Sequence, residues 1–328
     1  MSLPMRVGLG QFNELTDEML QFIKQMGCDD FLMNTPRLPG SARWEHADVA
    51  SLKARAEAWG LRLMALENVP VSFYDRIMLG LPGRDEQLGH MIHTVQSIGR
   101  AGVPILGYHW MPNSVWRTQP PAAVRGGALA TRFNLAEHAD APLSHGRVYT
   151  AEEIWDYYAW YLERILPVAE RAGVRLALHP DDPPVPSLGG VARIFGSFAG
   201  FRRAMDTFDS PCHGLDFCMG CWSEMGGHAQ VLEALRYFVP QRKVFYIHFR
   251  DVQGEAACFH ECFIDAGQVD TLEVVRTLRA LDFDGFLIPD HVPATVGDSP
   301  WHHRGRAHAV GYIQALVQVA EKLHAAAA

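Results

Sequence analysis

The feature that most constrains this chain is an alternation of strand and helix patterns that repeats eight times. Short runs of β-branched, aliphatic and aromatic residues are each followed by a longer segment with apolar residues at helical spacing. Strands are expected at Arg6–Gly10, Asp30–Asn34, Arg62–Glu67, Pro104–Tyr108, Arg175–His179, Gly214–Cys218, Val244–His248 and Phe286–Asp290. Helices are expected at Asp17–Met26, Ala47–Trp59, Asp85–Ala101, Ala151–Ala172, Phe198–Phe208, Gln230–Phe238, Thr271–Leu281 and Arg306–Ala326.

Eight strand–helix units in 328 residues predict an α/β fold, the closed (β/α)8 or TIM barrel. The main competitor is a doubly wound open sheet, which usually has fewer strands and often carries a glycine-rich phosphate loop. Gly8 and Gly10 are followed by Asn13 where that loop requires its third glycine, so a dinucleotide-binding motif is absent. The pattern therefore favours the barrel.

Two insertions interrupt the alternation. Met111–Tyr149 follows the fourth strand and is long, polar and rich in Pro, Gly and His, which is typical of a functional loop or lid. Pro180–Gly190 follows the fifth strand and contains four prolines. Because strand and helix units of similar composition continue on both sides of each insertion, we expect a single catalytic domain over residues 1–328, with residues 111–149 as an inserted loop.

Charge and composition exclude several classes of function. The chain has 29 basic and 37 acidic residues, a net charge of −8, and no Lys/Arg cluster to follow a phosphate backbone, so nucleic acid is not an expected partner. No apolar run approaches the roughly 20 residues that a bilayer crossing needs. We expect a soluble, cytoplasmic protein with no membrane contact and with its six cysteines reduced. Assembly into a homo-oligomer stays open.

Polar side chains stand at the carboxyl ends of the expected strands, which all reach the same face of a barrel. The second, third and fourth strands lead to Asn34, Glu67 and His109, and the last four lead to His179, Cys218, His248 and Asp290. Two imidazoles, one thiolate and one carboxylate on consecutive strands predict a site for one divalent transition metal ion per chain. This donor set favours Zn²⁺, Fe²⁺ or Co²⁺, tolerates Mn²⁺ and disfavours Mg²⁺.

Other residues near these strand ends leave alternatives open. Cys221, Cys258 and Cys262 could join Cys218 in a structural zinc site of four thiolates, or be loop thiols without a ligand role. Arg250 is placed to hold a substrate carboxylate in a bidentate manner, or to form a salt bridge with a nearby acid. The acidic pair after His179, Asp181 and Asp182, is either a support for the site or simply solvated.

Five segments of the chain also carry a family resemblance. They are Arg62–Val71, Leu178–Pro184 with its His-Pro-Asp-Asp-Pro-Pro run, Gly214–Cys218, His248–Val252 and Pro289–His291. They resemble the motifs of the mannonate dehydratases, and the likeness extends from Met5 to about Leu323. The resemblance implies a barrel of the xylose isomerase-like group that converts D-mannonate to 2-keto-3-deoxy-D-gluconate in hexuronate breakdown, using Mn²⁺ or Fe²⁺.

Transferred by motif, the family's metal ligands fall on the four residues already selected from the strand ends: His179, Cys218, His248 and Asp290. The proton-transfer histidine of the family falls on His291. Some members place a catalytic tyrosine shortly after this Asp-His pair, but Val292–Arg304 contains none. Trp301, His302 and His303 are candidates to occupy that space.

The expected activity is therefore a carbon–oxygen lyase reaction on a small sugar acid. His291 and Arg250 are the expected catalytic residues, and Asn34, Glu67, His109 and Arg250 are expected to bind the substrate. The main alternative is a sugar isomerase or epimerase on the same barrel, acting on a related sugar or sugar acid. A metal-dependent endonuclease is disfavoured by the negative charge, and a metal-stabilised binding scaffold is the non-catalytic alternative.

Overall fold

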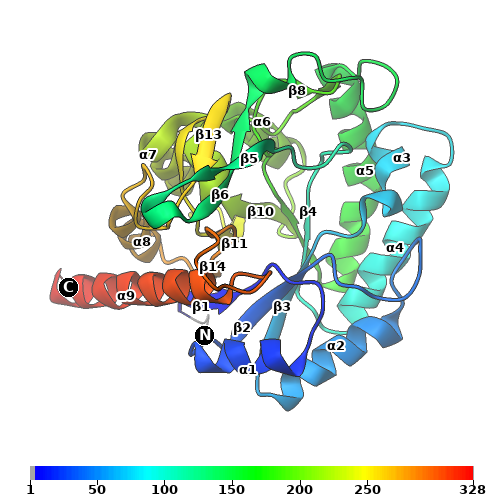
Figure 1. Ribbon diagram of the computed structural model, residues 1–328. Helices are drawn as coiled ribbons and strands as arrows, with labels where there is room; N and C mark the ends of the chain where they lie inside the picture. Colours follow the sequence, from blue (N-terminus) through cyan, green and yellow to red (C-terminus); the bar gives the residue numbers. More distant parts are fainter. Residues whose placement is uncertain (1–3, 328) are drawn as a thin grey trace.

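Eight parallel strands close into one barrel in the computed structural model, which describes residues 4–327 (Figure 1). Around the barrel they follow the order β1 (Arg6–Leu9), β14 (Phe286–Ile288), β11 (Val244–His248), β10 (His213–Cys218), β7 (Arg175–Leu178), β4 (Ile105–Tyr108), β3 (Arg62–Glu67) and β2 (Asp30–Asn34). The predicted barrel is confirmed, and each strand ends within about two residues of its predicted end. The domain expected at residues 1–328 extends past the described range at residues 1–3 and 328.

Long helices cover the outside of the barrel and pack on its strands (Figure 1). They are α1 (Asp17–Gln25), α2 (His46–Ala58), α4 (Arg84–Arg100), α5 (Ala151–Ala172), α6 (Phe198–Thr207), α7 (Met219–Phe238), α8 (Thr271–Ala280) and α9 (His303–Ala327). The loops add a short helix, α3 (Asp75–Met78), and single turns η1 (Val71–Phe73), η2 (Arg125–Gly127) and η3 (Leu135–His138). Among the helices of residues 4–327, none has the length and hydrophobicity that a membrane crossing demands.

Helix α7 begins well before its predicted start at Gln230. Gly226 and Gly227 leave the helical backbone conformation, with φ of 65° at Gly227, so α7 is kinked at this pair and continues on both sides of it. The two glycines made the first half of the helix unrecognisable in the sequence. As a result α7 starts directly after β10, and Cys218 is its N-terminal capping residue.

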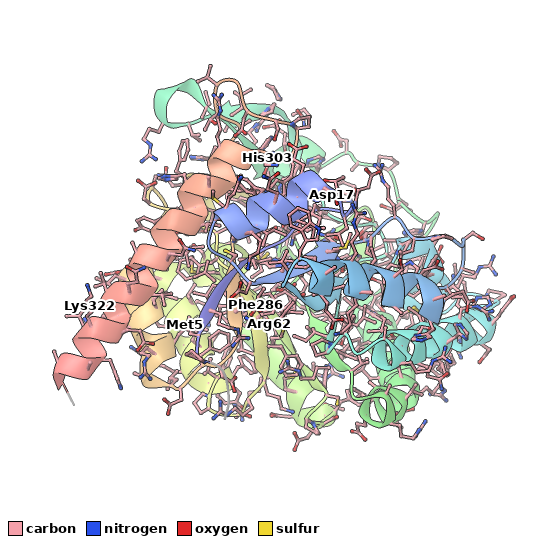
Figure 2. The ribbon with its side chains drawn as sticks, turned by 90° about the horizontal axis from the view of Figure 1, so that it is seen from below. Met5, Asp17, Arg62, Phe286, His303 and Lys322 are labelled. Atoms are coloured by element: carbon pink, nitrogen blue, oxygen red, sulfur yellow. The ribbon has the colours of Figure 1, made fainter. Side chains whose placement is uncertain are left out.

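Two apolar layers hold the barrel together. Side chains such as Leu32, Ala65, Ile105 and Tyr246 fill its interior, and a larger cluster packs the outer faces of the strands against the helices. Figure 2 views the molecule from the face where the strands begin, with Met5, Arg62 and Phe286 near its centre and α9 along one edge from His303 to Lys322. The carboxyl ends of the strands, and with them the candidate site, lie on the opposite face.

The two insertions are ordered parts of this opposite face. Residues 111–149 contribute β5 (Thr118–Ala123) and β6 (Leu129–Asn134), and the segment after β11 contributes β12 (Val252–Glu255) and β13 (Cys258–Glu261). The four strands form an antiparallel sheet in the order β12-β13-β6-β5, above β10 and β11 in Figure 1. The second insertion forms a small hairpin of β8 (Ser187–Leu188) and β9 (Val191–Ala192).

Candidate metal centre and active site

Three side chains able to hold a metal ion meet at the mouth of the barrel. His179 follows β7, Cys218 ends β10 and His248 ends β11, and these three strands are neighbours. One ligand atom of each residue lies within 4.8 Å of the other two. Cys218 and His248 are buried and His179 is half-buried. The neighbouring strand ends therefore form a candidate metal centre of two imidazoles and one thiol.

The ring nitrogens of both histidines fit metal ligation. His179 Nδ1 lies 2.6 Å from the carbonyl oxygen of Pro180, so this N–H donates to the backbone and Nε2 remains as a ligand. His248 Nδ1 is buried and has no hydrogen-bond partner among the protein atoms. Leaving a buried polar atom unpaired costs about 1–3 kcal/mol. A divalent cation held at this atom would satisfy it.

Of the neighbouring thiols Cys218 and Cys221, Cys218 ionises more readily and is the better candidate for a thiolate ligand. Burial opposes its ionisation, but a hydrogen bond from the Cys221 thiol and the charge of Arg250 outweigh burial and hold the pKa of Cys218 well below its ordinary value. Burial and the neighbouring Cys218 raise the pKa of Cys221, so Cys221 stays a thiol. The N-terminus of α7 also favours negative charge at Cys218.

Asp290, the fourth expected ligand, lies beside this group and not within it. Its Oδ2 is 3.6 Å from His248 Nδ1. Arg250 Nε donates to the same oxygen at 2.9 Å. The structure thus brings three of the four expected ligands together and holds the fourth against a buried guanidinium.

The alternative site of four thiolates is not formed. Cys258 is exposed on β13, and Cys262 Sγ lies 3.4 Å from the backbone oxygen of Asp251. Among residues 4–327, neither thiol belongs to a group of side chains close enough to share a metal ion. Cys258, on β13, and Cys262, just after it, are therefore thiols without a place in a four-thiolate site.

Glu67 and Asn34, which were expected to bind substrate, lie beneath His248. Glu67 Oε2 accepts a hydrogen bond from His248 Nε2 at 2.7 Å, and Glu67 Oε1 accepts from Asn34 Nδ2 at 3.3 Å. Gln11 Nε2 donates to the same Oε1 at 3.0 Å. The strand-end pattern identified these residues as part of the site, and their contacts are to the candidate ligand His248, to Gln11 and to each other.

His291 is the proton-carrier candidate that reaches solvent, with 37% of its side chain exposed. Its Nδ1 lies 2.5 Å from Glu261 Oε1, at the end of β13. Arg117, just before β5, donates to Glu261 at 2.8 Å and forms a bidentate pair with Asp182 at 2.6 and 2.8 Å. Burial lowers the pKa of His291, but the charges of Asp290 and Glu261 outweigh it, so this pKa is raised.

Arg250, the residue expected to bind a substrate carboxylate, lies buried among acidic side chains. It is 2% exposed, and its nitrogens lie 2.9 Å from Asp290, 3.1 Å from Asp182 and 3.2 Å from Glu224. Nη2 also donates to Cys221 Sγ at 3.3 Å. Each guanidinium nitrogen faces a buried protein acceptor, so Arg250 balances the charge of the acids beside the candidate metal centre.

His109 lies at the end of the fourth barrel strand as a neutral donor or acceptor. Its Nδ1 accepts a hydrogen bond from the backbone N–H of Met111 at 3.2 Å, which leaves the proton on Nε2. Burial, with the nearby positive charges of His179 and Arg193, lowers the pKa of His109 to about 3. His109 therefore suits a hydrogen bond to a substrate hydroxyl and not proton transfer near neutral pH.

Comparison with known proteins decides the family. A family model described as D-mannonate dehydratase (UxuA) matches residues 5–145 and 141–327. The chain belongs to the D-mannonate dehydratase family. The predicted family and the predicted enzyme class, a hydro-lyase, are confirmed, and dehydration is favoured over isomerisation or epimerisation.

Relatives in this family match over most of their length. The chain is 28% identical over 288 residues to the mannonate dehydratase of Streptococcus equi subsp. zooepidemicus, covering 80% of this chain and 78% of that protein. It is 27% identical over 330 aligned positions to mannonate dehydratase 2 of Halalkalibacterium halodurans, covering 92% and 93%. The crystal structure of mannonate dehydratase from Streptococcus suis serotype 2 superposes with a TM-score of 0.89 at 25% identity, covering 98% and 95%.

More distant structures share the fold alone. The structure of an L-ribulose 3-epimerase superposes with a TM-score of 0.64 at 14% identity, covering 99% of this chain and 98% of that chain. The D-mannonate dehydratase family consists of metal-dependent enzymes, and the group of His179, Cys218 and His248 is close enough together to hold a metal ion here. The predicted dependence on a metal is therefore confirmed for the family.

In this member of the D-mannonate dehydratase family, Val292–Arg304 lacks the tyrosine of some relatives and is held in place by other side chains. Trp301 Nε1 donates to the backbone oxygen of Gln11 at 2.8 Å, which brings the indole against the floor of the site. His302 Nδ1 lies 3.1 Å from the Val292 carbonyl, and His303 packs on Phe22. Of the three residues considered for the place of the tyrosine, Trp301 is the one that contacts a residue next to the candidate metal centre.

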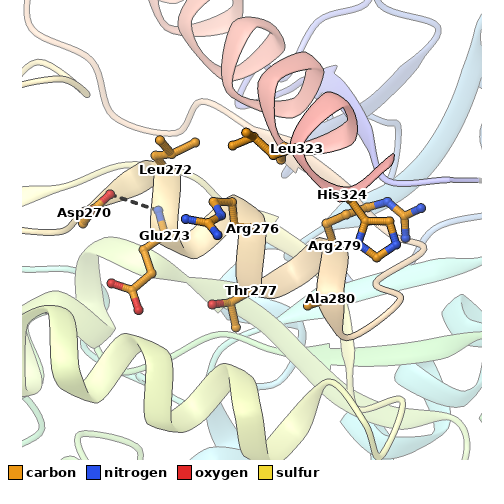
Figure 3. Close-up of a pocket in the computed structure, with 10 residues that line it drawn as sticks. Asp270, Leu272, Glu273, Arg276, Thr277, Arg279, Ala280, Leu323 and His324 are labelled. Atoms are coloured by element: carbon orange, nitrogen blue, oxygen red, sulfur yellow. Dashed lines mark hydrogen bonds between the residues drawn. The ribbon is translucent and has the colours of Figure 1, made fainter. Parts of the chain in front are cut away.

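Two grooves lie outside this centre. One of about 770 Å³ borders it where Gln11, Asn34 and Trp301 meet, at the ends of the first two strands. Another, of about 430 Å³, separates α8 from the end of α9 on the outer surface (Figure 3). Figure 3 shows Arg276, Arg279 and His324 on this outer groove, which shares no residue with the metal centre.

Proposed function

We propose that this chain dehydrates D-mannonate to 2-keto-3-deoxy-D-gluconate, a step of hexuronate breakdown, with one Mn²⁺ or Fe²⁺ per chain. One observation supports the proposal most strongly. In a chain of this family, two imidazoles and one thiol with a lowered pKa place their ligand atoms within 4.8 Å of one another. His179, Cys218 and His248 would hold the ion, with Asp290 beside them as the fourth ligand. Residues 1–328 would act as one catalytic domain in the cytoplasm, where the six free thiols stay reduced.

The reaction removes one proton from C2 of the sugar acid and delivers one proton to the hydroxyl at C3, which leaves as water. A divalent ion held by His179, Cys218 and His248 would supply positive charge next to the substrate, where negative charge develops as the proton leaves. His291 handles one of the two protons, because Glu261 fixes its Nδ1 and leaves Nε2 as the transferring atom. Neutral His109 donates a hydrogen bond to a hydroxyl of the substrate. The enol that results loses no further atoms and rearranges to the 2-keto product.

The function is tested by incubating the purified protein with D-mannonate and Mn²⁺ or Fe²⁺ under reducing conditions. We expect a product lighter by one molecule of water, detected by mass spectrometry, and no product after the metal is removed with a chelator. Restoring Mn²⁺, Fe²⁺, Co²⁺, Zn²⁺ or Mg²⁺ one at a time then identifies the active ion. A product of unchanged mass would instead establish the isomerase or epimerase alternative.

The role of the thiolate is tested by Cys218→Ser with Cys221→Ser as its matched control. Serine at position 218 removes the ionised ligand, so we expect metal affinity to fall at least about tenfold. Serine at position 221 leaves the three-residue group intact, so we expect a smaller loss. Competition against a fluorescent chelator measures both affinities, and equal losses would contradict the assignment of Cys218 as the ligand.

A further inference from the structure

We infer that Glu67 is a positioning residue of the metal centre, which holds the ring of His248 through Nε2 and directs Nδ1 to the ion. The inference rests on the metal centre proposed above. It replaces the expectation that Glu67 contacts a substrate hydroxyl. Three features of the Glu67 carboxylate support it: its distance to His248 Nε2, its burial and the number of hydrogen bonds it accepts.

The contacts of His248 define which nitrogen carries the proton. A carboxylate only accepts hydrogen bonds, so the 2.7 Å distance between Glu67 Oε2 and His248 Nε2 requires the proton on Nε2. Gln11 Nε2 also lies 3.2 Å from His248 Nε2, but it donates to Glu67 Oε1 at 3.0 Å and is not needed by the ring. With the proton on Nε2, the lone pair of Nδ1 is free, and this is the buried atom without a partner.

Glu67 is held in place by a complete set of hydrogen bonds. Oε1 accepts from Gln11 and Asn34, and Oε2 accepts from His248 and from the Tyr246 hydroxyl at 3.3 Å. A carboxylate offers about four lone-pair sites, so all of them are used. Glu67 is also 2% exposed. No acceptor site remains for a sugar hydroxyl.

The amides around Glu67 are themselves oriented. Asn34 Nδ2 donates to Gln11 Oε1 at 2.6 Å, and Thr35 Oγ1 donates to Asn34 Oδ1 at 2.9 Å. Gln11 and Thr35 have left-handed backbone conformations, with φ of 65° and 44°, in the loops that follow β1 and β2. Such conformations are strained in residues other than glycine, and most of all in a β-branched residue. The strain is consistent with a region built to hold amides in one orientation.

The test is Glu67→Gln, which keeps the size of the side chain and removes its charge. We expect the affinity for Co²⁺ alone, measured without substrate, to fall about 10- to 100-fold, the usual effect of losing a carboxylate behind a ligand histidine. The visible absorption of bound Co²⁺ should shift as well, because the donor strength of His248 changes. Asp30→Asn is the matched control: Asp30 is equally buried but is paired with Arg6 and Arg62 at the opposite end of the barrel.

A second measurement needs no variant. In ¹⁵N-labelled wild-type protein loaded with Zn²⁺, nuclear magnetic resonance should show the His248 proton on Nε2. A proton on Nδ1 would overturn the inference. Unchanged Co²⁺ affinity in Glu67→Gln would overturn it too, and a higher KM for D-mannonate with the same kcat would then make Glu67 a substrate contact. Because both measurements omit substrate, they hold even if D-mannonate proves not to be dehydrated.

Discussion

Replacing Arg250 with methionine is expected to lower the free energy of unfolding by about 3–5 kcal/mol, because it removes one partner from a buried set of ion pairs. Arg250 is 2% exposed and lies within 3.2 Å of three carboxylates, those of Asp290, Asp182 and Glu224. Methionine fills much of the same volume but leaves these acids without the central cation. Urea unfolding of both proteins, followed by circular dichroism, measures the difference.

The loss of unfolding free energy in Arg250→Met should be smaller at low pH than at neutral pH. Burial opposes ionisation of Asp182 and Glu261, but the nearby positive charges, those of Arg117 and Arg250 among them, outweigh it and lower both pKa values. Carboxylates with lowered pKa values contribute stability above their unfolded pKa and lose it as the pH falls through the folded value. The difference between wild type and Arg250→Met should therefore be largest near neutral pH and shrink below about pH 4.

Arg125→Met is the control for this experiment. Arg125 also forms an ion pair, with Asp265 at 2.7 Å, but its side chain is 51% exposed. Exposed pairs contribute about 0–1 kcal/mol. If Arg250→Met cost no more than this control and instead raised the KM for D-mannonate, the guanidinium would bind the substrate carboxylate, as its place after the seventh barrel strand first suggested.

The barrel and the three grouped metal-ligand candidates were predictable because both depend on local pattern and one geometric rule. Alternating strand and helix periodicity determines the fold. Parallel strands in a closed barrel bring their carboxyl ends to one face, so His179, Cys218 and His248 are placed by their position in the chain alone. The same rule selected Glu67 and Asn34 as residues of the site, although it does not tell which of them faces substrate.

The partners of Arg250 and His291 were not predictable in this way. Arg117 comes from the inserted loop at residues 111–149 and Glu261 from the segment after β11, and they meet because β13 pairs with β6 and β6 with β5 in an antiparallel sheet. The register of such pairing depends on long-range contacts and not on a local period. Asp182 was visible as an acid after His179, but its partner Arg117 is far away in the sequence. The sequence therefore assigned Arg250 to a substrate carboxylate from its place in the chain, before its contacts with distant acidic residues were known.

Turnover of D-mannonate is expected to fall about 10²- to 10⁴-fold in His291→Asn, the usual cost of losing a general acid or base. Asparagine can still donate to Glu261, which lies 2.5 Å from His291 Nδ1, so the sheet above the site should stay in place. The three residues grouped as metal ligands are untouched. We therefore expect kcat to fall while metal content and KM change little.

The matched control is His228→Asn. His228 is also paired with a glutamate, its Nε2 lying 3.0 Å from Glu273 Oε2, but the pair joins α7 and α8 on the outside of the barrel. Kinetics and metal analysis of both variants separate the two roles that remain for His291. Loss of metal together with activity would make it a support of Asp290, its neighbour in the chain. Loss of turnover with full metal content would leave proton transfer, because Glu261 fixes Nδ1 and only Nε2 of the partly exposed ring is free to exchange a proton with substrate.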